Sequence, residues 1–202
     1  MLKYQIPTWM QKCYRGVTWR KNTNRKVIYL TFDDGCVPEV TPQVLTILRN
    51  KGVKATFFCV GDNVRKYPEL FEQIKAEGHR VGNHTHNHLK GINTPLKMYL
   101  DNVAEANQLI GSTLFRPPYG KMTFQQKRKL QREYEIVMWD ILTNDFDAAT
   151  STTELIQQTK RHTRNGSVIV FHDSLKAAER MLHTLPTLID WWEEQGYAFE
   201  TL

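Results

Sequence analysis

The sequence predicts an α/β fold, and two features lead to this prediction. Short apolar runs rich in β-branched and aromatic residues alternate with amphipathic stretches from Arg25 to the C-terminus, which is the spacing of repeated βα units. The 202 residues, 41% of them hydrophobic, suffice for one sizeable core, and no linker divides them. We therefore expect a single domain whose parallel sheet closes, or nearly closes, into a barrel. An open doubly wound sheet satisfies the same pattern.

The apolar runs predict seven strands with helices between them. The strands are Val27–Phe32, Ala55–Val60, His79–Gly82, Leu114–Pro117, Glu135–Trp139, Ser167–Phe171 and Tyr197–Leu202. Helix starts are expected at Thr41-Pro42 and Thr94-Pro95, each a threonine cap before a proline, and at Thr123, which forms a capping-box pattern with Gln126. Further helices are expected from Asp62 to Gly78, from Ser151, and up to Gln195.

Positive charge gathers at the N-terminal end. Residues 1–26 contain seven Lys and Arg and no acid, whereas residues 27–202 hold 20 Lys and Arg against 21 Asp and Glu. The chain thus divides into a basic arm, 1–26, and a domain, 27–202. We expect the arm to pack Trp9 and Trp19 on the domain and to solvate its charges. Its composition also suits contact with an anionic partner, although nucleic acid is not the expected one.

Composition also bears on location. No apolar run approaches the ~18 residues of a membrane span, and the first 30 residues lack the continuous apolar stretch of a secretory signal. Three scattered cysteines, Cys13, Cys36 and Cys59, do not form a disulfide framework. We expect a cytoplasmic protein, and the sequence does not indicate its oligomeric state.

Titratable side chains follow most of the expected strands. In a barrel of βα units, the residues that follow the strands meet at one end, where active sites form. The residues in this position are Asp33, Asp34, His84, His88, Arg116, Asp140, Asp145, His172 and Asp173. The sequence therefore predicts one catalytic cluster at that end of the sheet.

A histidine cluster predicts a metal site. His84 and His88 are four residues apart, close enough to share an ion, and a carboxylate from a neighbouring strand end completes three protein ligands. His86 lies between them and is expected to point away. Asp33 and Asp34 are adjacent, so one can bind metal while the other takes a proton from water. The alternative for the histidine cluster is a hydrophilic loop that binds no metal, and the alternative for Asp33 and Asp34 is a simple Asp-Asp-Gly turn.

Four motifs together resemble the polysaccharide deacetylases, the NodB homology domain of carbohydrate esterase family 4. They are Thr31-Phe32-Asp33-Asp34-Gly35, His84-Thr85-x-x-His88, Arg116-Pro117-Pro118-Tyr119 and Val170-Phe171-His172. The resemblance runs in order through residues 27–202. It implies a distorted (β/α)7 barrel and metal-dependent removal of acetyl groups, usually from N-acetylglucosamine units of a glycan.

The resemblance also implies a role for each matching residue. Asp33 matches the general base and Arg116 the residue that orients it, while His172 matches the general acid. The metal ligands it implies are Asp34, His84 and His88, holding Zn²⁺ or else Co²⁺, Ni²⁺, Mn²⁺ or Fe²⁺. Around the acetyl group it implies Tyr119, whose backbone N–H donates to the oxyanion, with Pro118 and Phe146.

A further family motif, expected between the third and the last of these at residues 142–146, departs from the family pattern. Family members commonly read Asp-x-x-Asp-Trp, whereas this chain has Leu142 in place of the first acid and Phe146 in place of the tryptophan. Asp145 is the expected partner of His172, with Asp140 as the alternative.

We therefore predict a metal-dependent deacetylase acting on an N-acetylated sugar or polysaccharide. A hydrolase of small or cyclic amides on the same barrel is one alternative, and a glycan-binding protein without activity is another. A non-haem iron oxygenase also uses two histidines and a carboxylate, but it leaves Asp33 unexplained.

Overall fold

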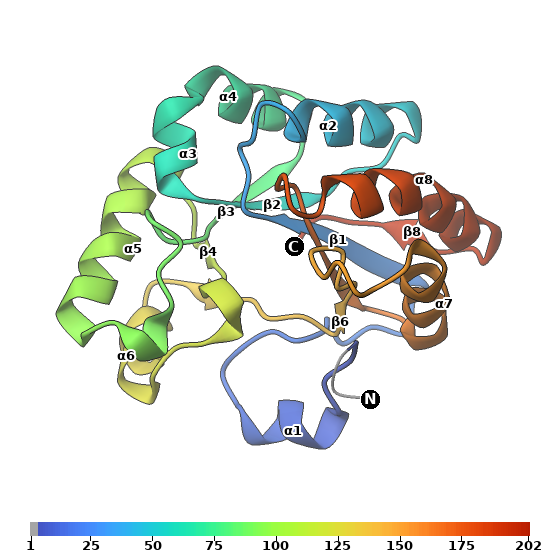
Figure 1. Cartoon of the computed structure of the whole chain (residues 1–202). Helices are drawn as coiled ribbons and strands as arrows, with labels where there is room; N and C mark the ends of the chain where they lie inside the picture. The colour runs from blue at the N-terminus through green and yellow to red at the C-terminus, as the bar shows by residue number, and fades with distance from the viewer. Residues whose placement is uncertain (1–3) are drawn as a thin grey trace.

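Eight parallel strands form one curled sheet in the computed structural model, which describes residues 4–202 and, of Cys13, the backbone alone. The strand order is β5-β4-β3-β2-β1-β7-β6, and β8 pairs with β1 (Figure 1). The strands are β1 (Val27–Asp33), β2 (Thr56–Cys59), β3 (Arg80–Asn83), β4 (Leu114–Phe115), β5 (Glu135–Ile136), β6 (Ile141–Leu142), β7 (Val168–His172) and β8 (Ala198–Phe199). The predicted α/β barrel is confirmed as a curled, partly closed sheet.

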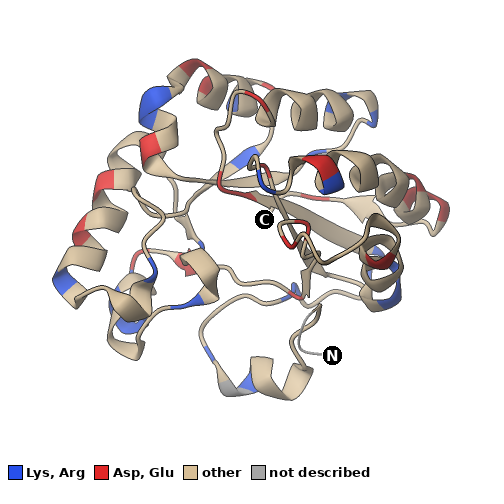
Figure 2. Cartoon of the chain, in the orientation of Figure 1, with Lys and Arg blue, Asp and Glu red and all other residues tan. Residues whose placement is uncertain are grey.

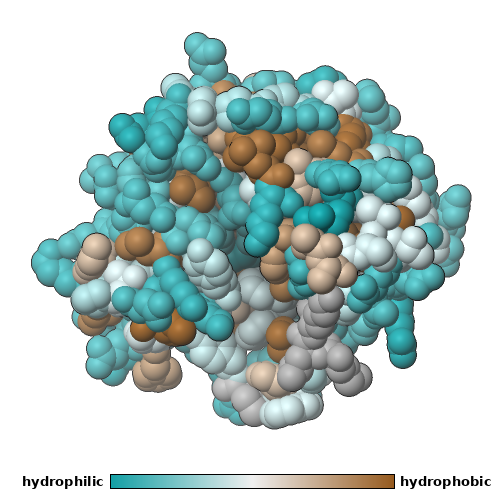
Figure 3. All heavy atoms as spheres, viewed as in Figure 1, coloured by the Kyte–Doolittle hydropathy of each residue, from teal (hydrophilic) through white to brown (hydrophobic). Residues whose placement is uncertain are grey.

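Helices cover the outside of this sheet. They are α1 (Thr8–Cys13), α2 (Thr41–Asn50), α3 (Gly61–Lys66), α4 (Pro68–Ala76), α5 (Leu96–Ile110), α6 (Phe124–Leu130), α7 (Thr152–His162) and α8 (Ala178–Glu194), with short 3-10 turns η1 (Gly91–Asn93) and η2 (Pro118–Gly120). Acidic and basic residues are both spread over the outer helices (Figure 2). Hydrophilic side chains cover most of the face seen in Figure 3, with hydrophobic ones in separate small patches.

Strand β1 is the centre of the fold. All seven of its residues are buried, and they pair with β2 on one side and β7 on the other. Its apolar side chains Ile28, Leu30 and Phe32 belong to a core cluster that also contains buried residues of α2 and α8. The register sets Asp33 opposite both Phe58 and His172. The strand ends that carry the predicted catalytic residues therefore meet in the middle of the sheet.

The N-terminal arm fills the gap between the two ends of the sheet. The Thr18 N–H donates to the Ile136 carbonyl at 2.8 Å, and the Leu142 N–H donates to the Tyr4 carbonyl at 2.9 Å. In Figure 1 the segment with α1 accordingly lies between α6 and α7. Its backbone therefore satisfies polar groups at both edges, which an open sheet would leave unpaired.

The side chains of the arm divide between the domain and solvent. Lys21 forms an ion pair with Glu135 at 2.7 Å, and Arg25 pairs with Glu200 at 2.9 Å. Trp19 is partly buried, but Trp9 is 68% exposed. The expectation that both tryptophans pack on the domain is therefore wrong for Trp9.

Three local predictions need correction. The strand expected over Glu135–Trp139 is only the two-residue strand β5, and a separate short strand, β6, follows it. Helix α1 was not expected. The helix expected from Asp62 to Gly78 is broken at Tyr67, because the residue before a proline is sterically excluded from the helical region. Val40, not Thr41, is the N-cap of α2; the Thr41 hydroxyl donates instead to Asp173 at 2.6 Å.

Candidate active site

The carboxyl ends of β1, β3 and β7 bring most of the predicted residues around one cavity of about 580 Å³. It is lined by Asp33, Asp34, His84, His88, Tyr119, Lys121, Trp139, Leu142, Phe146, Val170, His172, Ser174 and Lys176. Arg116 and Asp145 lie behind this lining, fully buried. Residues from five segments of the chain thus converge on one site, as the strand-end pattern predicts.

Asp34, His84 and His88 form a cluster with the geometry of a metal site. One ligand atom from each lies within 4.8 Å of the others. Asp34 Oδ1 is 3.2 Å from His88 Nε2 and 3.8 Å from His84 Nε2, and this oxygen is buried without a hydrogen-bond partner in residues 4–202. Buried polar atoms are rarely left unpaired. The three residues therefore fit a divalent cation, which would bond to the orphaned oxygen.

Protonation states in the cluster favour metal binding. Burial lowers the pKa of His84 to about 4, against the opposing charges of Asp33 and Asp34, so the ring is neutral at pH 7. His84 Nδ1 lies 2.8 Å from the Arg116 carbonyl, to which it donates, leaving the lone pair of Nε2 for a metal. Burial opposes ionisation of Asp34, but the adjacent His88 ring, whose Nε2 lies 3.2 Å from Oδ1, and the positive charge of His172 outweigh it and hold the pKa of the carboxyl below its usual range.

Buried asparagines fix the loop between the two histidine ligands. Asn102, on α5, accepts from the His86 N–H at 2.9 Å and the Asn87 N–H at 3.1 Å, and it donates to the Asn87 side chain. Asn83 accepts from the Thr85 N–H at 2.8 Å. These bonds hold Thr85 and His88 at φ values of 64° and 53°, which are unfavourable for residues with side chains.

Asn63 supports the third ligand in the same way. Its side chain donates to the Asp34 carbonyl at 2.8 Å, where the Asp34 backbone has a φ of 87°. Our sequence analysis did not find these asparagines, because a single asparagine in a helix or a strand carries no local signal of the loop that it binds.

Asp33 and Arg116 form an ion pair beside the metal cluster. The Arg116 Nη1 donates to Asp33 Oδ1 at 2.6 Å and to the Thr31 hydroxyl at 2.8 Å. Its other nitrogens donate to the carbonyls of Val137 and Met138. These hydrogen bonds fix the orientation of the buried guanidinium. Asp33 Oδ1 is held by Arg116, and Asp33 Oδ2 is directed toward the metal cluster, 4.0 Å from His84 Nε2.

His172 and Asp145 form a second pair across the cavity. His172 Nδ1 donates to Asp145 Oδ1 at 2.7 Å, and the His172 backbone N–H donates to Oδ2 at 2.7 Å. Burial opposes protonation of His172, but the Asp145 carboxylate, aided by Asp34 and Asp33, raises its pKa to about 9. The structure therefore pairs His172 with Asp145, the first of the two aspartates that we considered.

Asp140 is not at this site, which corrects our placement of it at the catalytic end. Its backbone N–H donates to the carbonyl of Val168, at the start of β7, and its carboxylate binds Arg164 and Ser167. The reason is local: the chain turns after Trp139, so Asp140 precedes a strand rather than following one. Asp173, also predicted there, is buried and accepts from the Gly35 N–H and the Thr41 hydroxyl.

Aromatic side chains wall the cavity. The Tyr119 ring packs on His88 with centroids 4.8 Å apart, and Phe146 packs on His172 at 4.9 Å. Tyr119 and Pro118 both belong to the short turn η2. The backbone N–H of Tyr119 makes no hydrogen bond within the described part of the chain. Trp139, which we did not predict, lies so close to Gly120 that a Cβ there would approach its ring to 2.4 Å.

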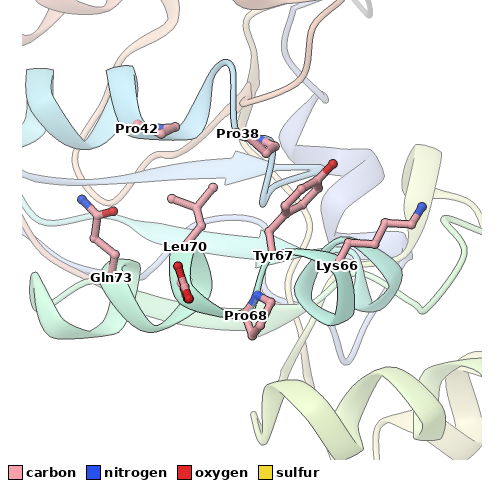
Figure 4. Close-up of a pocket in the computed structure, with 8 residues that line it drawn as sticks. Pro38, Pro42, Lys66, Tyr67, Pro68, Leu70 and Gln73 are labelled. Atoms are coloured by element: carbon pink, nitrogen blue, oxygen red, sulfur yellow. The ribbon is translucent and has the colours of Figure 1, made fainter.

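Two other groups lie outside the site. His86 points away, as expected, with Nε2 3.3 Å from Glu105. A separate hollow of about 510 Å³ lies between α2 and α4, and Figure 4 shows Pro38, Tyr67 and Leu70 among its lining. It contains none of the predicted catalytic residues.

Known proteins share this sequence and this fold. The family model described as polysaccharide deacetylase matches residues 20–139. A peptidoglycan-N-acetylglucosamine deacetylase of Bacillus cereus is 32% identical over 193 residues, covering 92% of this chain and 91% of that protein. PdaC of Bacillus subtilis, named a peptidoglycan-N-acetylmuramic acid deacetylase, is 31% identical over 189 residues, covering 89% of this chain and 38% of its own.

Solved structures agree with these matches. The peptidoglycan N-acetylglucosamine deacetylase Bc1960 has a TM-score of 0.88 at 29% identity, covering 98% of this chain and 95% of that one. A pseudoenzyme of carbohydrate esterase family 4 from Bacillus anthracis has a TM-score of 0.82 at 25% identity, covering 91% of this chain and 66% of its own. Because an enzyme and a pseudoenzyme share the fold, the side chains in the cavity decide what this chain does.

Proposed function

Because the chain belongs to the polysaccharide deacetylase family, we propose that it removes the acetyl group from acetamido sugars of peptidoglycan. The class of reaction is metal-dependent hydrolysis of an N-acetyl group on an N-acetylated glycan, as in its relatives. The names of the Bacillus cereus and Bacillus subtilis relatives support peptidoglycan as the substrate. The alternatives, a small cyclic amide or binding without catalysis, are not favoured.

We assign the metal to Asp34, His84 and His88, with Zn²⁺ as the proposed ion. When bound, such a cation lowers the pKa of water and polarises the acetyl carbonyl. Histidine and carboxylate ligands suit zinc, and three protein ligands leave room for water and substrate. Metal analysis of the purified protein identifies the ion.

The remaining residues move protons and position the reacting groups. Asp33, oriented by Arg116, takes the proton of the attacking water. The Tyr119 N–H donates to the oxygen that becomes negative as the carbonyl is attacked. His172, protonated and oriented by Asp145, then gives its proton to the departing amine, which is otherwise a poor leaving group.

One observation carries this proposal: a candidate general base and a candidate general acid, each bonded to a partner that orients it, flank the same metal cluster. Asp33 with Arg116 lies on one side, and His172 with Asp145 lies on the other. A binding protein needs neither a base nor an acid, and oxygen chemistry needs no such acid.

The test is acetate release by the metal-analysed protein from three substrate sets at equal acetyl concentration. They are peptidoglycan oligosaccharides, chitooligosaccharides and small cyclic amides. We expect acetate and a matching number of free amines from the glycans, with peptidoglycan the best substrate. Hydrolysis of the cyclic amides alone would overturn the proposal.

The location of the protein in the cell is a separate prediction. No helix in the described part of the chain has the length and apolar character to span a membrane. The cytoplasmic location expected from the sequence stays a prediction, which cell fractionation measures. A peptidoglycan substrate would place the reaction outside the cytoplasm. The same fractionation experiment therefore tests the predicted cytoplasmic location against the proposed substrate.

A further inference from the structure

Three lysines surround the catalytic cavity on three separate loops. Lys121 and Lys176 line the cavity itself. The Lys176 ammonium lies 5.6 Å from the ring centroid of Phe146, the residue that packs on His172. The Lys90 ammonium lies 5.8 Å from the ring of Tyr119, which packs on His88. Positive charge is therefore held on both sides of the site, next to rings that touch the catalytic residues.

These lysines lack acidic partners, unlike many others in the protein. Elsewhere Lys21, Lys51, Lys66, Lys75 and Lys97 form ion pairs with carboxylates. Over residues 4–202, no carboxylate lies in ion-pair contact with Lys90, Lys121 or Lys176.

The carboxylates of the site are already engaged. Asp33 pairs with Arg116, Asp145 pairs with His172, and Asp34 belongs to the metal cluster. The three ammonium groups are thus not neutralised by the protein. Uncompensated charge around a cleft attracts a ligand of the opposite sign.

The chemistry of deacetylation does not account for three further cations. The substrate amide is neutral, and its single developing negative charge faces the metal cluster and the Tyr119 N–H. We infer that Lys90, Lys121 and Lys176 bind a carboxylate carried by the substrate beside the acetamido sugar. Peptidoglycan strands carry such groups on their peptide stems, and on the lactyl ether of muramic acid wherever the stem has been removed, whereas chitin strands carry none. This inference rests on the proposed function and narrows it to carboxylate-bearing glycans.

The test compares two tetrasaccharides of equal length under steady-state conditions. One is a peptidoglycan fragment with free lactyl carboxylates, and the other is the same fragment with those carboxylates converted to methyl amides. We expect kcat/KM to favour the free carboxylate by about tenfold at low ionic strength, mainly through KM. The preference should shrink as salt is added, because screening weakens exposed charge pairs.

A lysine variant distinguishes recognition of the substrate carboxylate from a general effect of the lysines on activity. In the double variant Lys121→Gln and Lys176→Gln, which removes both lysines that line the cavity and keeps Lys90, most of the preference for the carboxylate fragment should be lost. Lys129→Gln, a change on the exposed face of α6 away from the cavity, should leave the preference intact. An equal loss on both fragments in the double variant would overturn the inference.

The product acetate is the other anion that these lysines could hold. Acetate inhibition that weakens in the double variant, with the preference between fragments unchanged, would assign the lysines to product and overturn the inference. If the unaltered protein releases acetate from neither fragment nor from chitotetraose, the proposed function itself fails.

Discussion

The pair of His172 and Asp145 predicts how activity depends on pH. His172 must be protonated to act as the acid, so activity falls as pH rises through its pKa. Burial lowers that pKa and the Asp145 carboxylate raises it, with a net value of about 9. A cation bound by Asp34 offsets part of the negative charge there, so we expect the alkaline limb of the holoenzyme below 9. Asp145→Asn keeps the shape of the side chain and removes the charge.

The size of the expected change in the pH profile of Asp145→Asn follows from the difference between the two pKa values of His172. The interval between the ordinary value of 6.5 and about 9 corresponds to about 3 kcal/mol. Asp145 is the main contributor that raises the pKa, and burial continues to lower it in the variant. We therefore expect the alkaline limb to move by at least about one pH unit toward acid, and kcat at pH 8 to fall by about tenfold or more.

The assay is the pH profile of kcat for acetate release, with metal content measured at each pH. Asp140→Asn is the matched control, because it alters another buried aspartate whose bonds to Arg164 lie away from the cavity. It should lower stability and leave the profile unmoved. If Asp145→Asn loses activity equally at every pH, the assignment of Asp145 as the residue that tunes the acid is wrong.

The same pair predicts a pH-dependent stability. Because the folded pKa of His172 lies above 6.5, the pair stabilises the fold fully below pH 6.5, and this contribution is lost as pH rises toward about 9. Asp145→Asn should therefore lower Tm more at pH 6 than at pH 10. An equal decrease at both values would contradict the raised pKa.

Four further changes test other parts of the site and fold. Asp34→Ala should abolish stoichiometric metal binding without unfolding the protein, as measured by metal analysis and circular dichroism, whereas Asp33→Asn should keep the metal and lose at least ~100-fold in kcat. Asn102→Ala should weaken metal affinity by about tenfold or more in calorimetric titration, because it frees the loop that carries both histidine ligands; unchanged affinity would make Asn102 merely structural. Deletion of 1–26 should lower Tm and impair all substrates alike at any salt concentration, since the arm pairs with both edges of the sheet; unchanged stability would contradict that reasoning.

Much of the site could be predicted because its residues follow strands. Strand β1 is a continuous apolar run, so its end at Asp33 is visible in the sequence, and the same holds for β7 and His172. Parallel pairing then sets the two residues opposite each other. The histidine spacing of four was equally informative, because both ligands lie in one short loop.

The features that were missed depend on distant contacts. Strand β6 has two residues, too few for a periodic pattern, and it exists because β7 and the arm pair with it. Asp140 was misplaced because the turn after Trp139 has no glycine or proline to mark it. Asn102 supports a loop 15 residues earlier in the chain, and nothing around it in the sequence points there.

Acetate release during metal titration of the apoprotein tests the central claim most directly. The chelated protein is titrated with Zn²⁺ in the presence of peptidoglycan oligosaccharides, and acetate and free amines are counted together. We expect no acetate without metal, a rise that saturates at one equivalent per chain, and no such saturation in His88→Ala. Acetate release by the metal-free protein, or none at any metal loading, would contradict the account.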